Sequence, residues 1–175
     1  MKGEILYVNS QPCLLHSVEE GGMSTVFLVE KIGSDIFGEK IKYLAVKKFN
    51  SDLNITEIRR ELSIWLSMDS KFILPLYSIG DVNDCLAAIS PWRKNGTLSL
   101  DHALRHTEKF LTALLFDIVN GLDYAWKNKN VVHLDIKPNN IFLSDDLSRY
   151  ELAEWGVSKI SSNNRLSCLY MDGSA

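Results

Sequence analysis

Three side chains with the chemistry of phosphoryl transfer lie in residues 131–143, which read VVHLDIKPNNIFL. Phosphoryl transfer needs a carboxylate that accepts a hydroxyl proton, a cation that neutralises the moving group and an oxygen ligand for Mg²⁺. Asp135, Lys137 and Asn140 offer these groups in that order, and His133 precedes them. The alternative is a polar surface loop between a helix and a strand, but four apt residues rarely coincide at such offsets.

The pattern His-x-Asp-x-x-x-x-Asn resembles the catalytic loop of the protein kinases, with Leu134 where Arg is usual. The chain is therefore identified as similar to the eukaryotic-like (Hanks-type) Ser/Thr protein kinases. The resemblance implies that Asp135 is the catalytic base, that Lys137 assists it and that Asn140 binds metal. Because leucine cannot pair with a phosphate, phosphorylation of the activation loop is not expected to be a switch. The serines that follow are expected to be ordinary loop residues: Ser161, Ser162 and Ser167.

A pair of glycines, Gly21 and Gly22, separates two β-rich runs and predicts a hairpin. The hairpin resembles the glycine-rich loop of bacterial-type Ser/Thr kinases, where glycines let the backbone approach phosphate oxygens. This copy is degenerate, because Glu19 and Ser24 replace the first and third motif glycines. Glu19 should weaken nucleotide binding, since it adds negative charge near a polyanion. An ordinary Gly-Gly hairpin is the alternative interpretation.

The strand predicted over residues 43–49 contains LAVK, which resembles the V-A-I-K strand of kinases. The resemblance makes Lys47 the candidate lysine for the α- and β-phosphates. Side chains alternate along a strand, so Lys47 shares the face of Ala45, whereas Lys48 points to the other side. A lysine at a strand edge is the alternative.

A helix is predicted over residues 54–68, because apolar residues recur there at helical spacing. Two of its acids, Glu57 and Glu61, are candidates to hold Lys47. Trp65 lies one turn after Glu61 and faces the same way, which favours Glu61. Surface charge is the alternative role for both acids.

The motif Glu154-Trp155-Gly156 resembles the D-F-G motif, whose Asp binds the Mg²⁺ that bridges the nucleotide phosphates. Glu154 retains a hard oxygen ligand for Mg²⁺ or Mn²⁺. Its extra methylene displaces the carboxylate by roughly 1 Å, and misplacement of that size can cost roughly 10²-fold in rate. The substitution therefore predicts a weakened site.

The adenine site also follows from the resemblance. Val26, Ala45 and Phe142 should sandwich the ring, with a hinge at residues 87–93 and Ser90 near the gatekeeper position. A plain apolar core would use the same residues. Four further side chains should stack as a column between the lobes: Trp65, Leu76, His133 and Trp155.

Strands, one helix, more strands and then helices predict an α+β fold with a complete small lobe, an antiparallel sheet plus one helix, and a partial helical large lobe. The expected domains are a small lobe at 1–89 and a partial large lobe at 90–175, the latter holding the catalytic loop and the start of the activation segment. The Ala-Pro-Glu motif of kinases is absent before Ala175, so a chain truncated after that start is expected.

Composition points to a globular protein, because 46% of the 175 residues are hydrophobic and 23% are charged. The net charge of −3 argues against nucleic acid as a partner. No signal peptide or membrane span is evident, and the scattered Cys13, Cys85 and Cys168 indicate neither disulfides nor a metal site. A cytoplasmic protein without a membrane partner is expected.

The segment 109–127 predicts a helix that is apolar on most of its faces, including Leu115, Ile118 and Val119. A helix of this kind is normally buried against other protein on most of its faces. We therefore expect a homodimer or a protein partner docked against it.

Three functions remain open from the sequence. The first is a Ser/Thr protein kinase that uses ATP with Mg²⁺, or alternatively Mn²⁺, to phosphorylate a protein substrate. The second is a pseudokinase that binds nucleotide weakly or not at all and regulates a protein partner through its helical face. The third is a small-molecule phosphotransferase, which is disfavoured because Lys137 follows the base at the protein-kinase spacing.

Overall fold

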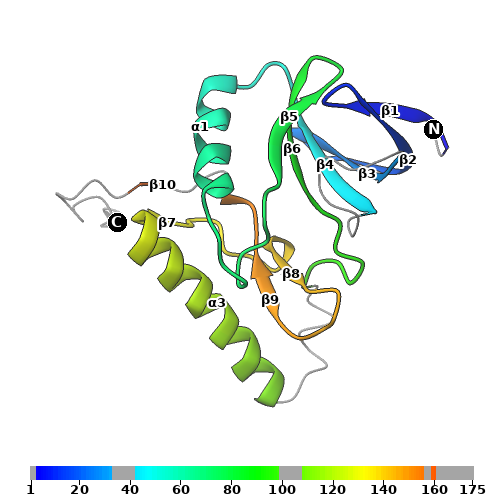
Figure 1. Ribbon diagram of the computed structural model, residues 1–175. Helices are drawn as coiled ribbons and strands as arrows, with labels where there is room; N and C mark the ends of the chain where they lie inside the picture. Colours follow the sequence, from blue (N-terminus) through cyan, green and yellow to red (C-terminus); the bar gives the residue numbers. More distant parts are fainter. Residues whose placement is uncertain (1–2, 33–41, 99–107, 156–158, 161–175) are drawn as a thin grey trace, which may run out of the picture.

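The computed structural model describes residues 3–32, 42–98, 108–155 and 159–160. Its larger sheet is antiparallel, has the strand order β1-β2-β3-β4-β6-β5 and curls next to helix α1 (Figure 1). Helix α3 and the small β8–β9 sheet lie below it (Figure 1). The architecture is α+β, as the sequence predicted.

The elements of the upper part are β1 (Ile5–Val8), β2 (Gln11–Glu20), β3 (Ser24–Lys31), β4 (Tyr43–Phe49), α1 (Ile55–Leu66), β5 (Ser78–Val82) and β6 (Cys85–Pro91). The lower part contains α3 (Glu108–Lys129), β7 (Val131–Val132), a 3-10 helix (Pro138–Asn140), β8 (Ile141–Leu143), β9 (Tyr150–Leu152) and β10 (Lys159–Ile160). The predicted domain boundary after residue 89 falls within β6 and stays a prediction.

Strand β1 is an addition that the sequence analysis did not predict. It joins β2 through a tight turn whose Asn9 and Ser10 have φ of 50° and 61°, and it reaches β5 on the far side of the sheet. There the Asn9 N–H donates to the Asp81 carbonyl (3.1 Å), and the Asp81 N–H donates to Asn9 Oδ1 (2.9 Å). A Cβ on Gly80 would lie 1.9 Å from Asn9 Oδ1, so this approach requires glycine. The sheet is thereby closed on itself at its two edge strands.

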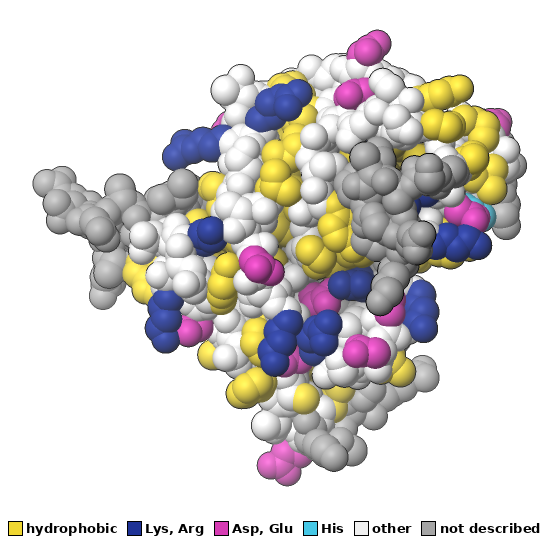
Figure 2. Space-filling view, viewed as in Figure 1, with side chains coloured by type: hydrophobic (Ala, Val, Ile, Leu, Met, Phe, Trp, Pro, Cys, Tyr) yellow, Lys and Arg dark blue, Asp and Glu magenta, His cyan; other side chains and the backbone are white. Residues whose placement is uncertain are grey.

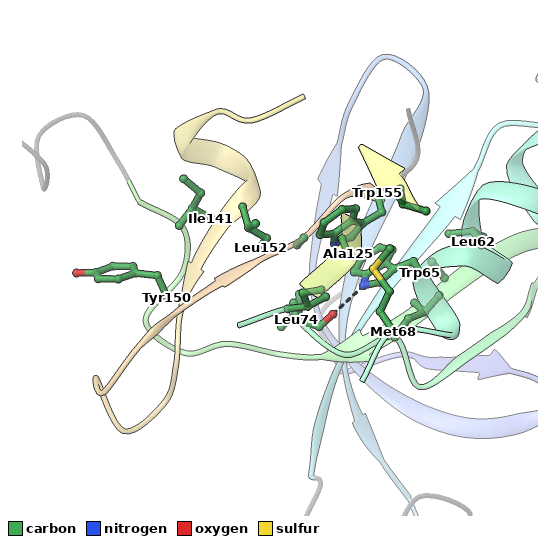
Figure 3. Packing of buried hydrophobic residues seen from close by; sticks show 14 of the residues in the cluster. Leu62, Trp65, Met68, Leu74, Ala125, Ile141, Tyr150, Leu152 and Trp155 are labelled. Atoms are coloured by element: carbon green, nitrogen blue, oxygen red, sulfur yellow. Dashed lines mark hydrogen bonds between the residues drawn. The ribbon is translucent and has the colours of Figure 1, made fainter. Parts of the chain in front are cut away.

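Helix α1 confirms the helix predicted at 54–68. Asn54 caps its start, because Asn54 Oδ1 accepts a hydrogen bond from the Glu57 N–H at 3.3 Å. Leu62 and Trp65 are buried on its inner face, and Trp65 Nε1–H donates to the Leu74 carbonyl at 2.7 Å (Figure 3). This face fixes α1 against the core.

An apolar run precedes β5. Such a run is typical of a buried strand, but Leu74 and Leu76 lie before β5, which begins at Ser78. Both side chains are nevertheless buried in the core, so the apolar run reflects burial rather than a strand. The Leu74 N–H donates to the Leu152 carbonyl, which ties this segment to β9.

Helix α3 lies close to β9 on one side only. A Cβ on Gly121 would stand 3.0 Å from Leu152 Cδ1 and 3.1 Å from the Phe72 carbonyl, so glycine permits this close packing. The opposite side exposes large apolar side chains: Leu111, Leu115, Phe116, Val119 and Trp126. Within the described residues, no helix combines the length and apolar character needed to cross a membrane.

Candidate active site

The predicted catalytic loop is a network centred on Asp135. Lys137 Nζ donates to Asp135 Oδ2 at 2.7 Å, and Asn140 Nδ2 donates to the same oxygen at 2.9 Å. Asn140 Nδ2 also donates to the Asp135 carbonyl at 2.8 Å, from the end of the 3-10 helix. The hydrogen bond from Lys137, with a smaller one from Asn140, lowers the pKa of Asp135 despite its partial desolvation. The carboxylate is therefore ionised at neutral pH, as a proton acceptor must be.

His133 supports this loop from the core. Its Nε2–H donates to the Ala153 carbonyl at 2.9 Å, and its Nδ1 accepts from the Asp135 N–H at 3.2 Å. The ring lies 4.4 Å from the ring of Trp155 between centroids. Trp155, Trp65 and Leu76 belong to one buried cluster, as predicted for the column; Figure 3 shows the two tryptophans pointing into it. Nδ1 serves as an acceptor, so the imidazole is neutral in this network.

Stability should rise with pH because of His133. Burial lowers the pKa of His133 below its usual 6.5. The unfolded chain therefore binds more protons than the folded chain in the window just below pH 6.5, and folding stability is lost as pH falls through that window. We expect His133→Gln to flatten this slope, measured as the urea midpoint between pH 5 and 7. A slope that is unchanged in His133→Gln would assign it to other groups.

Lys47 and Ala45 share one face of β4, and both line the same cavity, which confirms the alternation argument. The partner of Lys47, however, is Glu154, whose carboxylate forms an ion pair with Lys47 Nζ. The sequence analysis expected Glu61 to hold this lysine. The difference has a physical cause: the longer glutamate side chain of the E-W-G motif extends its carboxylate to Lys47.

Glu61 lines the same cavity but makes no ion pair among the described residues. Burial, with a smaller contribution from the nearby charge of Glu57, raises the pKa of Glu61. An attractive cation at Glu61 would have the opposite effect. Its assignment as the carboxylate that holds Lys47 in catalysis stays a prediction.

The backbone is strained on both sides of the site. Leu134, directly before Asp135, has φ 64°, and Glu154 has φ 63°. Non-glycine residues in this left-handed region cost of order 1–3 kcal/mol and cluster at functional sites. The two residues therefore flank the cavity in conformations that the surrounding hydrogen bonds must maintain.

These groups line a cavity of about 830 Å³ between the sheet and the catalytic loop. Val26, Ala45 and Phe142 line it, as predicted for an adenine sandwich, and so do Ser90 and Arg93 of the predicted hinge. From the glycine hairpin, the lining includes Glu19, Met23 and Ser24 but neither Gly21 nor Gly22. Figure 2 shows acidic and basic side chains side by side across the lower middle of this face. The assignment of the two glycines to phosphate binding stays a prediction.

The donor set fits a magnesium ion. Asn140 uses Nδ2 to bond Asp135, an orientation that leaves its Oδ1 as an oxygen ligand, and Glu154 adds a carboxylate. Mg²⁺ is usually held by one or two carboxylates together with substrate phosphates. Within the described part of the chain, no group of three His, Cys, Asp or Glu side chains could hold a metal unaided.

A charged cluster beside the cavity was missed by the sequence analysis. Arg93 donates to both carboxylate oxygens of Glu151, through Nε at 2.7 Å and Nη2 at 3.0 Å. The two residues are 58 positions apart in the sequence and belong to no motif. Only an expectation that a hinge arginine needs a carboxylate could have suggested the pair.

Comparison with known proteins adds the family. The family model of the protein kinase domain matches residues 14–172. The chain belongs to the protein kinase family. Its fold is accordingly a protein-kinase-like α+β fold, with the curled antiparallel sheet as the small lobe.

Several Ser/Thr kinases are similar to this chain. The serine/threonine-protein kinase cst-1 of Caenorhabditis briggsae is 32% identical over 75% of the chain and 28% of its own length. PrkC of Bacillus subtilis is 27% identical over 88% of the chain and 24% of its own length. Human receptor-interacting serine/threonine-protein kinase 3 is 29% identical over 91% of the chain and 32% of its own length. The chain thus spans less than a third of these relatives.

Proposed function

We propose that this chain carries the nucleotide-binding and catalytic-loop part of a Ser/Thr protein kinase that transfers the γ-phosphate of ATP to a protein hydroxyl. The observation that supports it best is the convergence of Asp135, Lys137 and Asn140 on a cavity that Lys47 and Glu154 also line. Ser/Thr kinase relatives support the same substrate class.

Each side chain has a step to perform. Asp135 Oδ2 accepts the proton of the substrate hydroxyl as the hydroxyl oxygen attacks the γ-phosphorus and the bond from that phosphorus to the departing ADP breaks. Lys137 Nζ, 2.7 Å from that oxygen, neutralises charge as the phosphoryl group moves. Lys47 holds the α- and β-phosphates. Asn140 and Glu154 would hold Mg²⁺ or Mn²⁺, which would supply positive charge to stabilise the phosphates during transfer.

Transfer of labelled phosphate tests this proposal. The protein is incubated with [γ-³²P]ATP and Mg²⁺ or Mn²⁺, alone and with a generic acceptor such as myelin basic protein. We expect slow incorporation that Asp135→Asn abolishes and Lys127→Gln, an exposed change outside the cavity, leaves intact. Incorporation equal in Asp135→Asn would point to a contaminating kinase and contradict the proposal.

Nucleotide binding should be weak. Lys47, Asn140 and Glu154 line the cavity, but Glu19 adds negative charge to the same lining, and the Lys47 ammonium is paired with a carboxylate. A ligand at 100 times its Kd stabilises the fold by about 2.7 kcal/mol, so a weak ligand gives a small shift in Tm. We expect a measurable Tm increase only at millimolar Mg·ATP, and a larger one in Glu19→Gly.

A second candidate is a pseudokinase that regulates a protein partner. The Lys47–Glu154 pair favours it, because both groups that should meet phosphate and metal are occupied by each other. No thermal stabilisation at millimolar Mg·ATP, in a sample shown to be folded, would select this candidate over the kinase.

A further inference from the structure

The segment that follows β6 is fastened to the β8–β9 hairpin along its length. The Leu98 N–H donates to the Ile141 carbonyl at 2.8 Å, and the Leu143 N–H donates to the Gly96 carbonyl at 3.1 Å. Asn95 Nδ2 adds a bond of 2.7 Å to the Ser144 carbonyl. The segment and the hairpin therefore behave as one unit beneath the cavity.

Arg93 makes the strongest of these connections. Its guanidinium donates two hydrogen bonds, of 2.7 and 3.0 Å, to the Glu151 carboxylate and a longer one, of 3.4 Å, to Asp145. Glu151 is 2% exposed and Arg93 15% exposed, so the pair is shielded from water. Arg149 approaches Glu151 only to 3.6 Å. A buried carboxylate that loses its main cation is left uncompensated, which is strongly destabilising.

The position of Glu151 connects this pair to the metal ligands. Glu151 lies opposite Phe142 in the β8–β9 register, and Glu154 follows three residues later. Between them, the Ala153 N–H donates to the Asn140 carbonyl at 2.9 Å. A shift of β9 would therefore move Asn140 and Glu154 together, along with the floor residue Phe142.

We propose that the Arg93–Glu151 pair is a positioning device that fixes β9 against the segment after β6, so that Asn140 and Glu154 meet one metal ion at the nucleotide phosphates. The inference rests on the proposed function, since it assigns Glu154 and Asn140 to metal. It adds two positioning residues that are not metal ligands: Arg93, which also lines the cavity, and Glu151, which does not.

The pair could instead stabilise the fold without placing the metal ligands, and a double variant separates these roles. Replacing both members of a buried ion pair by apolar residues is often neutral or stabilising, whereas removing one is costly. We expect Arg93→Leu to lower Tm sharply and Arg93→Leu/Glu151→Leu to recover most of the loss. A double variant that recovers stability but not metal binding isolates the positioning role.

The decisive measurement is Mn²⁺ binding in the presence of ADP, followed by electron paramagnetic resonance. Partners that orient metal ligands typically contribute about 10–100-fold to metal affinity. We expect that loss in the folded double variant and a smaller loss in Arg93→Lys, which keeps the charge but not the two parallel N–H donors. Because Arg93 lines the cavity and Glu151 does not, the control is Glu151→Gln, in which ADP affinity in EDTA should be unchanged. Glu151→Gln has nearly the same shape as the wild type, so it should also lose Mn²⁺ affinity, even if the double variant fails to fold.

Three outcomes overturn proposals, and they are distinguishable. Wild-type Mn²⁺ affinity in the folded double variant, or in Glu151→Gln, overturns the positioning role while leaving the kinase proposal in place. Equal losses of ADP affinity with and without metal in Glu151→Gln also overturn it, because they indicate general damage to the cavity. A wild-type protein that binds neither ADP nor Mn²⁺ overturns both proposals.

Discussion

Glu154→Asp is expected to raise phosphotransfer by about 10–100-fold, because a geometric misplacement of about 1 Å can cost roughly 10²-fold. The glutamate carboxylate forms its ion pair with Lys47, at the opposite wall of the cavity. An aspartate at this position is one methylene shorter, so its carboxylate withdraws from Lys47. The change frees the lysine for phosphate and returns the carboxylate to the metal.

The measurement is the rate of ³²P incorporation at saturating ATP, with Mg²⁺ and Mn²⁺ compared. Mn²⁺ should partly rescue the wild type, since its coordination tolerates more distortion, and should help Glu154→Asp less. Glu4→Asp is the matched control, because it shortens an exposed acid outside the cavity lining. Activity that stays unchanged or falls in Glu154→Asp would mean that the site has adapted around glutamate.

The local parts of the site were predictable from the sequence. Asp135, Lys137 and Asn140 lie within six positions, so a short loop and one turn of 3-10 helix suffice to bring them together. The alternation of β4 likewise placed Lys47 and Ala45 on the cavity side. Spacing fixes such arrangements because the backbone geometry of a turn or a strand is nearly constant.

The non-local pairings were not predictable. Helical periodicity placed Glu61 toward the cavity, but the choice between Glu61 and Glu154 depends on how α1 and the E-W-G motif approach β4. The Arg93–Glu151 pair depends on the same kind of long-range approach. Strand β1 was missed for a different reason, since its turn uses Asn9 and Ser10 rather than the glycine that usually marks such a turn.

One side of α3 is exposed and apolar, so we expect a homodimer. A single charged substitution on that side should dissociate it. Leu111, Leu115 and Val119 follow one another at intervals of four residues, and Leu115 and Val119 are 60% and 59% exposed. Residues four apart form one ridge of a helix, and two such ridges interdigitate when helices pack. The ridge lies near the middle of a 22-residue helix, so a second copy can place the same ridge against it in an isologous contact.

Leu115→Lys should therefore convert a dimer into a folded monomer, measured by light scattering and by far-UV circular dichroism. Ile118→Lys is the matched control, at a partly buried position of the same helix. Ile118 packs against the core, so lysine there should unfold the large-lobe part rather than yield a native monomer. The two variants should differ because of the orientation of α3. Gly121 and Leu114 face β9 and the core, whereas Leu115 faces outward. A wild-type protein that stays monomeric and free of aggregates at high concentration would contradict the dimer. It would also remove the main physical reason to expect a docked partner on this face, since an apolar ridge of this size seldom stays exposed in a soluble monomer.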